Sequence, residues 1–353
     1  MAYITFQPHD FFNTLLYTGD GQASRSVTGV GFQPDWVWFK NRNTTDHHKL
    51  FDAVRGANKV LYGNLTAQEA TVTQELQSFN SDGFTVGTES AMNGNGNGIA
   101  AWNWRAAGTS GSANSDGSIA STVSVNTTAG FSIVSYTGTG SAGATVGHGL
   151  GAKPAFILEK ARTVTDDWLI YHHKLGATMG LALNNNTAQT DSDSYWNDVE
   201  PTSTVFTIGG NGKVNSSGDT HIAYVFTEKK GFSKFGSYLG NGSAGNGPFI
   251  YTGFKPGFLL IKRSIGGTDS WFLNDTARAS FGNVSSNPSK VYLRPNETSA
   301  EGTSGSHEIM ILSNGFKILS SDTAYNTDGN TYTYYAFAEE PLVASNEDPA
   351  TAR

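Results

Sequence analysis

The chain of 353 residues carries a formal net charge of −7, has only 15% charged but 12% aromatic residues, and contains no cysteine. This composition excludes a disordered chain, which would be rich in charge and poor in aromatics, and it excludes disulfides, zinc–thiolate sites and thiol catalysis. The negative charge argues against nucleic acid or an anionic membrane as a partner, and we expect neither a membrane span of about 18 apolar residues nor a signal peptide.

One pattern occurs three times along the chain. Each copy opens with an aromatic strand and a glycine turn, and continues with an apolar strand that ends in lysine. The opening strands are expected at 12–17, 131–136 and 232–238, and the apolar strands within 31–40, 151–160 and 253–262. Because Pro34, Pro154 and Pro256 keep the same offsets as the three lysines, we interpret the chain as three copies of one unit.

The ends of the copies match as well. An alternating strand is expected at 84–86, 206–208 and 316–318, and a closing aromatic strand at 101–104, 223–226 and 335–337. Between the two lies a cluster of Asn, Gly and Asp at 93–98, 215–219 and 326–330. We predict that each cluster is a hairpin turn, since Asn and Gly tolerate positive φ angles.

The number and spacing of the short strands favour an all-β fold. We expect three tandem homologous β-sandwich repeats, with a barrel as the less favoured closure. Helix is scarce, and residues 66–69 form either one or two helical turns or a loop shared by the copies. The predicted domains are 1–106, 131–229 and 230–340, with a Gly/Ser/Thr-rich linker at 107–130 that contains a possible strand at 118–125, and a polar tail at 341–353.

The acidic residues lie in no recognisable catalytic motif. A glycosidase would need two carboxylates facing each other across a cleft. One acid recurs, as Asp46, Asp166 and Asp269, and a turn in which Asp bonds its own backbone explains it. Because no second acid recurs beside it in all three copies, the sequence predicts a protein that is not an enzyme.

Metal binding is also not expected. The adjacent histidines at 47–48 and 172–173 point to opposite faces of a strand, so a pair cannot hold one metal with both rings. The segment 326–330 resembles part of a calcium loop but lacks the distal Glu. We therefore predict no metal and no cofactor.

The lysine that ends each apolar strand, with the arginine after it, is the clearest candidate for a polar site. In the structural interpretation, the lysine stem covers the edge of the sandwich while its charge reaches water. In the functional interpretation, these cations and neighbouring aromatics contact an acidic surface polysaccharide. The residues concerned are Lys40, Arg42, Lys160, Arg162, Lys262 and Arg263.

Seven tryptophans could stack on sugar rings. Trp168 and Trp271 match each other, with His48 in the first copy, and are interpreted as structural. Trp196 has no counterpart in the other copies and is therefore the better candidate for a glycan contact. The remaining four occupy strand positions where other copies carry Phe, Leu or Tyr, which indicates core packing: Trp36, Trp38, Trp102 and Trp104.

Several specific motifs run through the chain: FQP at 6–8, DFFNT at 10–14, YTG at 17–19, GFQPDWVW at 31–38, DAVRG at 52–56, FSIVSYTG at 131–138, GFSKFGSY at 231–238 and ATAR at 350–353. They resemble a family of uncharacterised structural proteins of tailed bacteriophages, common in marine phages and usually described as tail-fibre or lectin-like (concanavalin-like). The resemblance covers nearly the whole chain and implies a virion component with lectin-like or jelly-roll-type sandwiches, but it implies no catalytic residues.

The sequence and the resemblance together lead to two expectations about function. The first is a non-enzymatic virion protein of the tail or tail fibre that adheres to host-surface glycans, because weak sites repeated on one chain gain strength through effective concentration. The second is a capsid or tail decoration or connector protein with a purely structural role. In either case we expect assembly in the host cytoplasm, a place on the exterior of the particle, a homo-oligomer, and other virion proteins as partners.

Overall fold

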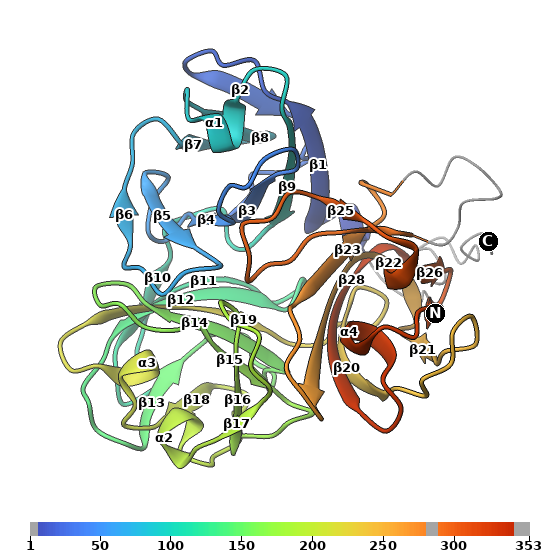
Figure 1. The fold of residues 1–353 in the computed structure, drawn as a ribbon. Helices are drawn as coiled ribbons and strands as arrows, with labels where there is room; N and C mark the ends of the chain where they lie inside the picture. The colour runs from blue at the N-terminus through green and yellow to red at the C-terminus, as the bar shows by residue number, and fades with distance from the viewer. Residues whose placement is uncertain (1–5, 280–288, 342–353) are drawn as a thin grey trace.

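The computed structural model describes residues 6–279 and 289–341 (Figure 1). Strands make up 43% and helices 7%, and the named strands all pair antiparallel, which confirms the all-β fold class. No helix in the described ranges is long and apolar enough to cross a membrane. The predicted tail at 341–353 lies outside the described residues, apart from the backbone of Pro341 at the end of the last strand.

Three large sheets share one spatial order of strands. In each sheet the opening strand pairs with the closing strand, then come the apolar strand and the strand that follows it in the chain. We call the parts of the chain around these sheets unit one (12–104), unit two (112–226) and unit three (233–341). The equal order agrees with the three copies read in the sequence, whose homology remains a prediction.

The large sheets have the following strands, in spatial order. Unit one has β1 (Phe12–Thr18), β9 (Gly98–Trp104), β3 (Trp36–Asn41), β4 (Lys49–Asp52), β5 (Lys59–Tyr62) and β6 (Ala70–Thr71). Unit two has β10 (Ser112–Asn114), β11 (Ser121–Asn126), β12 (Phe131–Thr137), β19 (Thr220–Phe226), β14 (Phe156–Ala161), β15 (Leu169–His172), β16 (Met179–Ala182) and β17 (Thr190–Asp191). Unit three has β20 (Ser233–Leu239), β28 (Thr331–Pro341), β22 (Phe254–Ile265) and β23 (Phe272–Asp275), with β24 (Val291–Tyr292) and β25 (Gly302–Thr303) as a separate pair.

A smaller sheet covers one face of each large sheet, which is consistent with a β-sandwich. Each small sheet and its large sheet enclose an apolar core that belongs to that unit alone. The strands are β2 (Arg25–Thr28), β8 (Gly83–Val86) and β7 (Leu76–Asn80) in unit one, β13 (Ala144–Gly147) and β18 (Val205–Ile208) in unit two, and β21 (Phe249–Tyr251), β27 (Gly315–Ile318) and β26 (Ile309–Leu312) in unit three.

The other face of each large sheet packs against the other two units. Side chains alternate between the two faces of a strand, so in β3 Val37 and Phe39 enter the core of unit one while Trp36 and Trp38 enter a core shared by all three units. All six residues of β3 are therefore buried, as in a strand covered on both faces. The four tryptophans interpreted as core residues do lie in a core, but in the shared one.

Aromatic rings join the units pairwise in this shared core. Trp36 stacks on Tyr224 at 4.4 Å between ring centres, which joins units one and two. Phe12 stacks on Phe337 at 5.4 Å and joins units one and three. A cavity of about 20 Å³ remains in the shared core, lined by side chains of all three units that include Trp36, Phe156 and Phe337, and it has room for about one water molecule.

The prediction of a hairpin turn at the three Asn/Gly clusters is wrong. Each cluster begins at the end of a one-turn helix that connects the small sheet to the large one: α1 (Ser90–Asn93), α3 (Gly212–Asn215) and α4 (Thr323–Asn326). The helix forms because the last Asn is buried and its amide is bonded inside the connection, as when Asn93 donates to the carbonyls of Gln22 and Gly87. The glycine that follows does adopt a positive φ, as expected, with 79° at Gly96.

The remaining elements are short. In the linker, the observed strand β11 (Ser121–Asn126) overlaps the strand predicted at 118–125. It pairs with β12, and β10 (Ser112–Asn114) pairs with β11. Residues 66–69 form a loop rather than a helix. The other helical turns are α2 (Asp193–Trp196), η1 (Pro8–Asp10) and η2 (Gly305–His307).

Candidate functional site

The three lysines singled out in the sequence lie at the contacts between units, which we call seams. Lys40, Lys160 and Lys262 are each 0% exposed, so the expectation that their charges reach water is wrong. The physical reason is that the large sheet is covered on both faces, so the end of the apolar strand is not a free edge. The stems follow the shared core, and the ammonium groups meet loops of the neighbouring unit.

Each ammonium group donates to three backbone carbonyls, of which one belongs to the neighbouring unit. The Lys160 Nζ donates to Ala161 and Asp166 of unit two at 3.0 and 2.9 Å, and to Thr66 of unit one at 3.1 Å. Three N–H bonds thus meet three acceptors, which satisfies a buried ammonium group without a carboxylate in direct contact. The other two lysines have the same arrangement, with Thr298 and Asn186 as the acceptors across the seam.

The direction of these contacts is cyclic. The lysine of unit two reaches unit one, that of unit one reaches unit three, and that of unit three reaches unit two. The three seams therefore close one ring.

Burial lowers the pKa of Lys40, Lys160 and Lys262 to about 8, while nearby aspartates such as Asp166 oppose this shift.

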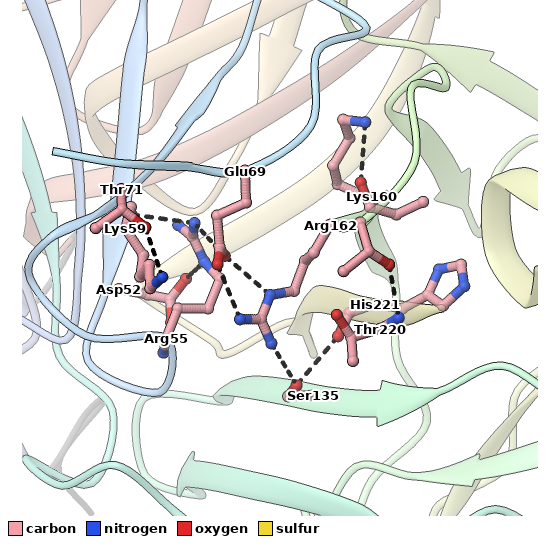
Figure 2. Close-up of polar contacts among 12 residues, drawn as sticks. Asp52, Arg55, Lys59, Glu69, Thr71, Ser135, Lys160, Arg162, Thr220 and His221 are labelled. Atoms are coloured by element: carbon pink, nitrogen blue, oxygen red, sulfur yellow. Dashed lines mark hydrogen bonds and ion pairs between the residues drawn. The ribbon is translucent and has the colours of Figure 1, made fainter. Parts of the chain in front are cut away.

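The seam between units one and two also holds a buried charge network, shown in Figure 2. Arg162 of unit two donates two hydrogen bonds to the carboxylate of Glu69 in unit one, at 2.9 and 3.1 Å. Arg55 reaches the same carboxylate at 3.2 Å and pairs with Asp52 at 2.5 Å. The hydroxyl of Tyr224 in unit two donates to Asp52 at 2.7 Å, so two acids and two arginines from both units form one group.

The seam between units three and one has the same network with other residues. Arg42 of unit one donates two hydrogen bonds to the carboxylate of Glu301 in unit three, at 2.8 and 2.7 Å, and Arg278 forms an ion pair with Asp275 at 2.5 Å. Here the indole nitrogen of Trp102 takes the place of the tyrosine hydroxyl and donates to Asp275 at 3.0 Å. Both networks thus combine one bidentate pair across the seam with one fully buried Asp–Arg pair.

The seam between units two and three lacks this network. His172 stands at the position of the buried aspartate, Leu175 at that of its arginine partner, and Gln189 at that of the glutamate. Ser264 stands at the position of the arginine that crosses the other two seams, since the Gln189 amide donates to its carbonyl as the Glu69 amide donates to that of Arg162. Arg263, one residue earlier, pairs with Asp269 of its own unit at 2.9 Å. All four positions of the network therefore carry other residues in this seam.

Trp196 lies in the core of unit two and is 1% exposed, packed edge to face against Tyr171. The interpretation of Trp196 as a glycan contact is therefore wrong. It has no counterpart because unit two has the helical turn α2 beside β18, where unit one has the stretch before β7 beside β8. The equivalence follows from two matching hydrogen bonds: the Gly209 amide donates to the carbonyl of Tyr195 in α2, and the Gly87 amide donates to the carbonyl of Glu75.

Two further tryptophans lie at seams, a role that sequence reasoning missed. The indole nitrogen of Trp168 donates to the carbonyl of Tyr62 in unit one, and that of Trp271 to the carbonyl of Ala182 in unit two, both at 2.9 Å. In unit one His48 takes this position and accepts a bond from Trp38. The signal in the sequence was the shared place of these residues after the Thr-Asp turn.

A buried acid–base pair in the core of unit two was also missed. The carboxylate of Glu159 lies 2.7 Å from Nδ1 of His221, and both side chains are fully buried. Burial raises the pKa of Glu159, and the histidine opposes that shift. The corresponding residues in unit one are Phe39 and Ile99, so a single glutamate in an otherwise apolar strand was the available signal.

The polar side chains described above make many of their contacts across the seams between units. The described residues contain no group of three or more His, Asp or Glu side chains that could hold a metal ion. No curated protein matches the chain, and no solved structure does. A family model described as a domain of unknown function, DUF7483, matches residues 7–341, so the chain belongs to that family.

Proposed function

We propose that the chain is a non-enzymatic structural protein of a tailed-bacteriophage particle, acting as a tail or tail-fibre component that adheres to host-surface glycan. The observation that carries this proposal is the use of the chain's most distinctive polar side chains to lock three units into one body. The three buried lysines and the two charge networks are all satisfied across seams.

The same observation disfavours a hydrolytic role for the acids that sequence reasoning weighed. Asp52 and Asp275, the acids nearest to a repeated arrangement, each bind an arginine at 2.5 Å and are fully buried. A glycosidase needs one acid with a raised pKa and another facing it across a cleft. Both aspartates instead bind an arginine inside a seam and face no open cleft in the described residues.

A rigid body of three units suits a display role on a particle. Because the units share one core, outward sites on it keep fixed positions relative to each other, and several copies of the chain would multiply weak contacts through effective concentration. The resemblance to phage structural proteins supports the same assignment. Since the buried lysines and Trp196 offer no surface, an adhesive site would have to use other residues.

A decoration or connector protein is the second candidate. It is favoured by the arrangement of three similar units about one centre, because such a body presents three related sides to a partner with threefold symmetry. In that role the chain would bind other virion proteins and no glycan.

The test is immunogold electron microscopy of purified particles of the phage that encodes the chain, with antibody against the recombinant protein. Gold on the tail or fibres supports the adhesive role, and gold spread over the head supports decoration. Unlabelled particles from a lysate that contains the antigen would overturn the assignment to the virion. Particles of an unrelated phage serve as the control for background labelling.

A further inference from the structure

The small sheet of unit three turns an apolar face outward. Its three strands bury one side in the core of the unit, through residues such as Ile250 and Phe316. The alternate residues therefore point to solvent, and Phe249 is 48% and Tyr251 56% exposed. We call this outward side the β21 face. It consists of Phe249, Tyr251, Met310, Leu312, Gly315 and Lys317.

The corresponding face of unit one is polar. Strand pairing aligns β21 with β2, β27 with β8 and β26 with β7, so each position has a counterpart. Ser26 stands where unit three has Phe249, Thr28 where it has Tyr251, and Thr85 where it has Lys317. The same scaffold is therefore stable with a polar face, and the aromatics of unit three are not required by the sandwich.

The two rings and the lysine are arranged side by side. In the register of the sheet, Phe249 is opposite Lys317 and Tyr251 is opposite Gly315. A side-chain carbon at Gly315 would come within 3.2 Å of the Phe249 ring, so the ring lies close to β27 while the residue remains 48% exposed. The two aromatic residues follow each other on one edge strand, with their Cα atoms about 7 Å apart, and Lys317 is the direct neighbour of Phe249 on the adjacent strand.

Lys317 is a free cation on this face. None of the described residues forms an ion pair with it, and Glu308, just before β26, is already paired with Lys290 at 2.8 Å. On a chain with a net charge of −7, a lysine without an ion pair, next to Phe249 on a face that also carries Tyr251, marks a place for an anionic ligand with apolar faces.

The size of the face selects among the possible occupants. Three strands spaced about 4.8 Å apart, each with about four residues, cover roughly 200 Å². A stable contact between two protein chains buries about 800 Å² on each partner. The β21 face is therefore too small to hold a second copy by itself, but it matches one or two sugar rings.

We propose that the β21 face binds an acidic polysaccharide, with uronic acid units as the ligand class. The rings of Phe249 and Tyr251 would stack against the C–H faces of two sugar rings, and Lys317 would pair with a carboxylate. This inference rests on the proposed adhesive function and names its site and ligand. The site lies on the outer side of unit three, away from the seams (Figure 1).

The test is calorimetric titration of the full chain with oligogalacturonate, with neutral dextran oligosaccharide as the comparison. Three substitutions copy unit one and so keep the scaffold: Phe249→Ser, Tyr251→Thr and Lys317→Thr. We expect oligogalacturonate but not dextran to bind, and each aromatic substitution to weaken binding about tenfold. Lys317→Thr should remove most of the salt dependence between about 20 and about 300 mM salt. Thr85→Ala, on the polar face of unit one, is the matched control and should bind like the wild type.

Three results would overturn the proposal. They are no binding of oligogalacturonate by the wild type, equal binding by the wild type and the triple variant, and a dimer that Phe249→Ser converts to a monomer. The last result would make the face an interface between copies. None of the three bears on immunogold labelling of particles, so failure of this site and failure of the virion assignment can be told apart.

Discussion

At the scale of single residues, the buried lysines make stability depend on pH. Because burial lowers the pKa of Lys160 to about 8, the folded chain releases this proton at a pH where an unfolded lysine, with a pKa of about 10.4, still holds it. Between these values the unfolded state binds more protons, so stability rises with pH through this window and the gain is lost as pH falls through 8. We expect the free energy of unfolding of the wild type to rise, relative to Lys160→Met, by up to about 1.4 kcal/mol for each pH unit above 8.

Urea unfolding of both proteins at several pH values between about 8 and 10 measures this difference. The exposed Lys174 provides the control, and Lys174→Met should follow the wild type at every pH. A difference between wild type and Lys160→Met that does not change with pH would mean that the lysine keeps an ordinary pKa in the fold.

The Glu159–His221 pair leads to a second prediction at this scale. Replacing a buried ionic pair by apolar residues of similar volume is often neutral or stabilising, by about 1–4 kcal/mol, whereas removing one partner is costly. Glu159→Phe with His221→Ile copies Phe39 and Ile99 of unit one. The double variant should unfold at the same or a higher urea concentration than the wild type, and Glu159→Phe alone at a lower one. A double variant less stable than the single would contradict this account.

The sequence could locate the important residues but not their partners. The positions of Lys40, Lys160 and Lys262 follow from the repeat, yet an amphipathic strand end looks the same whether it meets water or another unit. The acceptor Thr66 lies 94 residues before Lys160 in the chain, and no local pattern records such a contact. For Trp196 the prediction failed because the lack of a counterpart in the other copies indicated a residue on the surface, whereas α2 places its side chain in the core of unit two.

At the scale of elements, the seams offer an exchange experiment. Arg55→Leu alone leaves Asp52 and Glu69 buried with one arginine fewer, which should destabilise the chain by about 3–5 kcal/mol. The quadruple variant Asp52→His, Arg55→Leu, Glu69→Gln, Arg162→Ser gives the first seam the residues that the seam between units two and three already has at these positions. We expect the quadruple variant to lose less than half as much stability as Arg55→Leu in urea unfolding, because the four positions are coupled. A quadruple variant as unstable as the single would show that the charges act separately.

Strands were the elements that sequence reasoning predicted best. The alternation in 84–86 and the apolar runs at 31–40 and 151–160 correspond to β8, β3 and β14. The hairpin turns failed because Asn and Gly mark a change of direction without saying which sheet the next strand joins. The buried Asn93 belongs to a connection between two sheets, and only the packing of those sheets distinguishes it from a tight turn.

At the scale of the whole molecule, the shared core removes the independence that the predicted domains imply. Residues 1–106, 131–229 and 230–340 were read as separate sandwiches. In the structure each large sheet buries one face against the other two units, through pairs such as Trp36–Tyr224 and Phe156–Tyr335. A unit removed from this arrangement would expose that face to water, so the three units should fold and unfold together.

Differential scanning calorimetry of the full chain tests this central claim most directly. If the seams and the shared core couple the units, the chain unfolds in one transition, with a calorimetric enthalpy equal to the van't Hoff enthalpy. Three resolved transitions, or a calorimetric enthalpy about three times the van't Hoff value, would contradict the account and return the units to the status of independent domains.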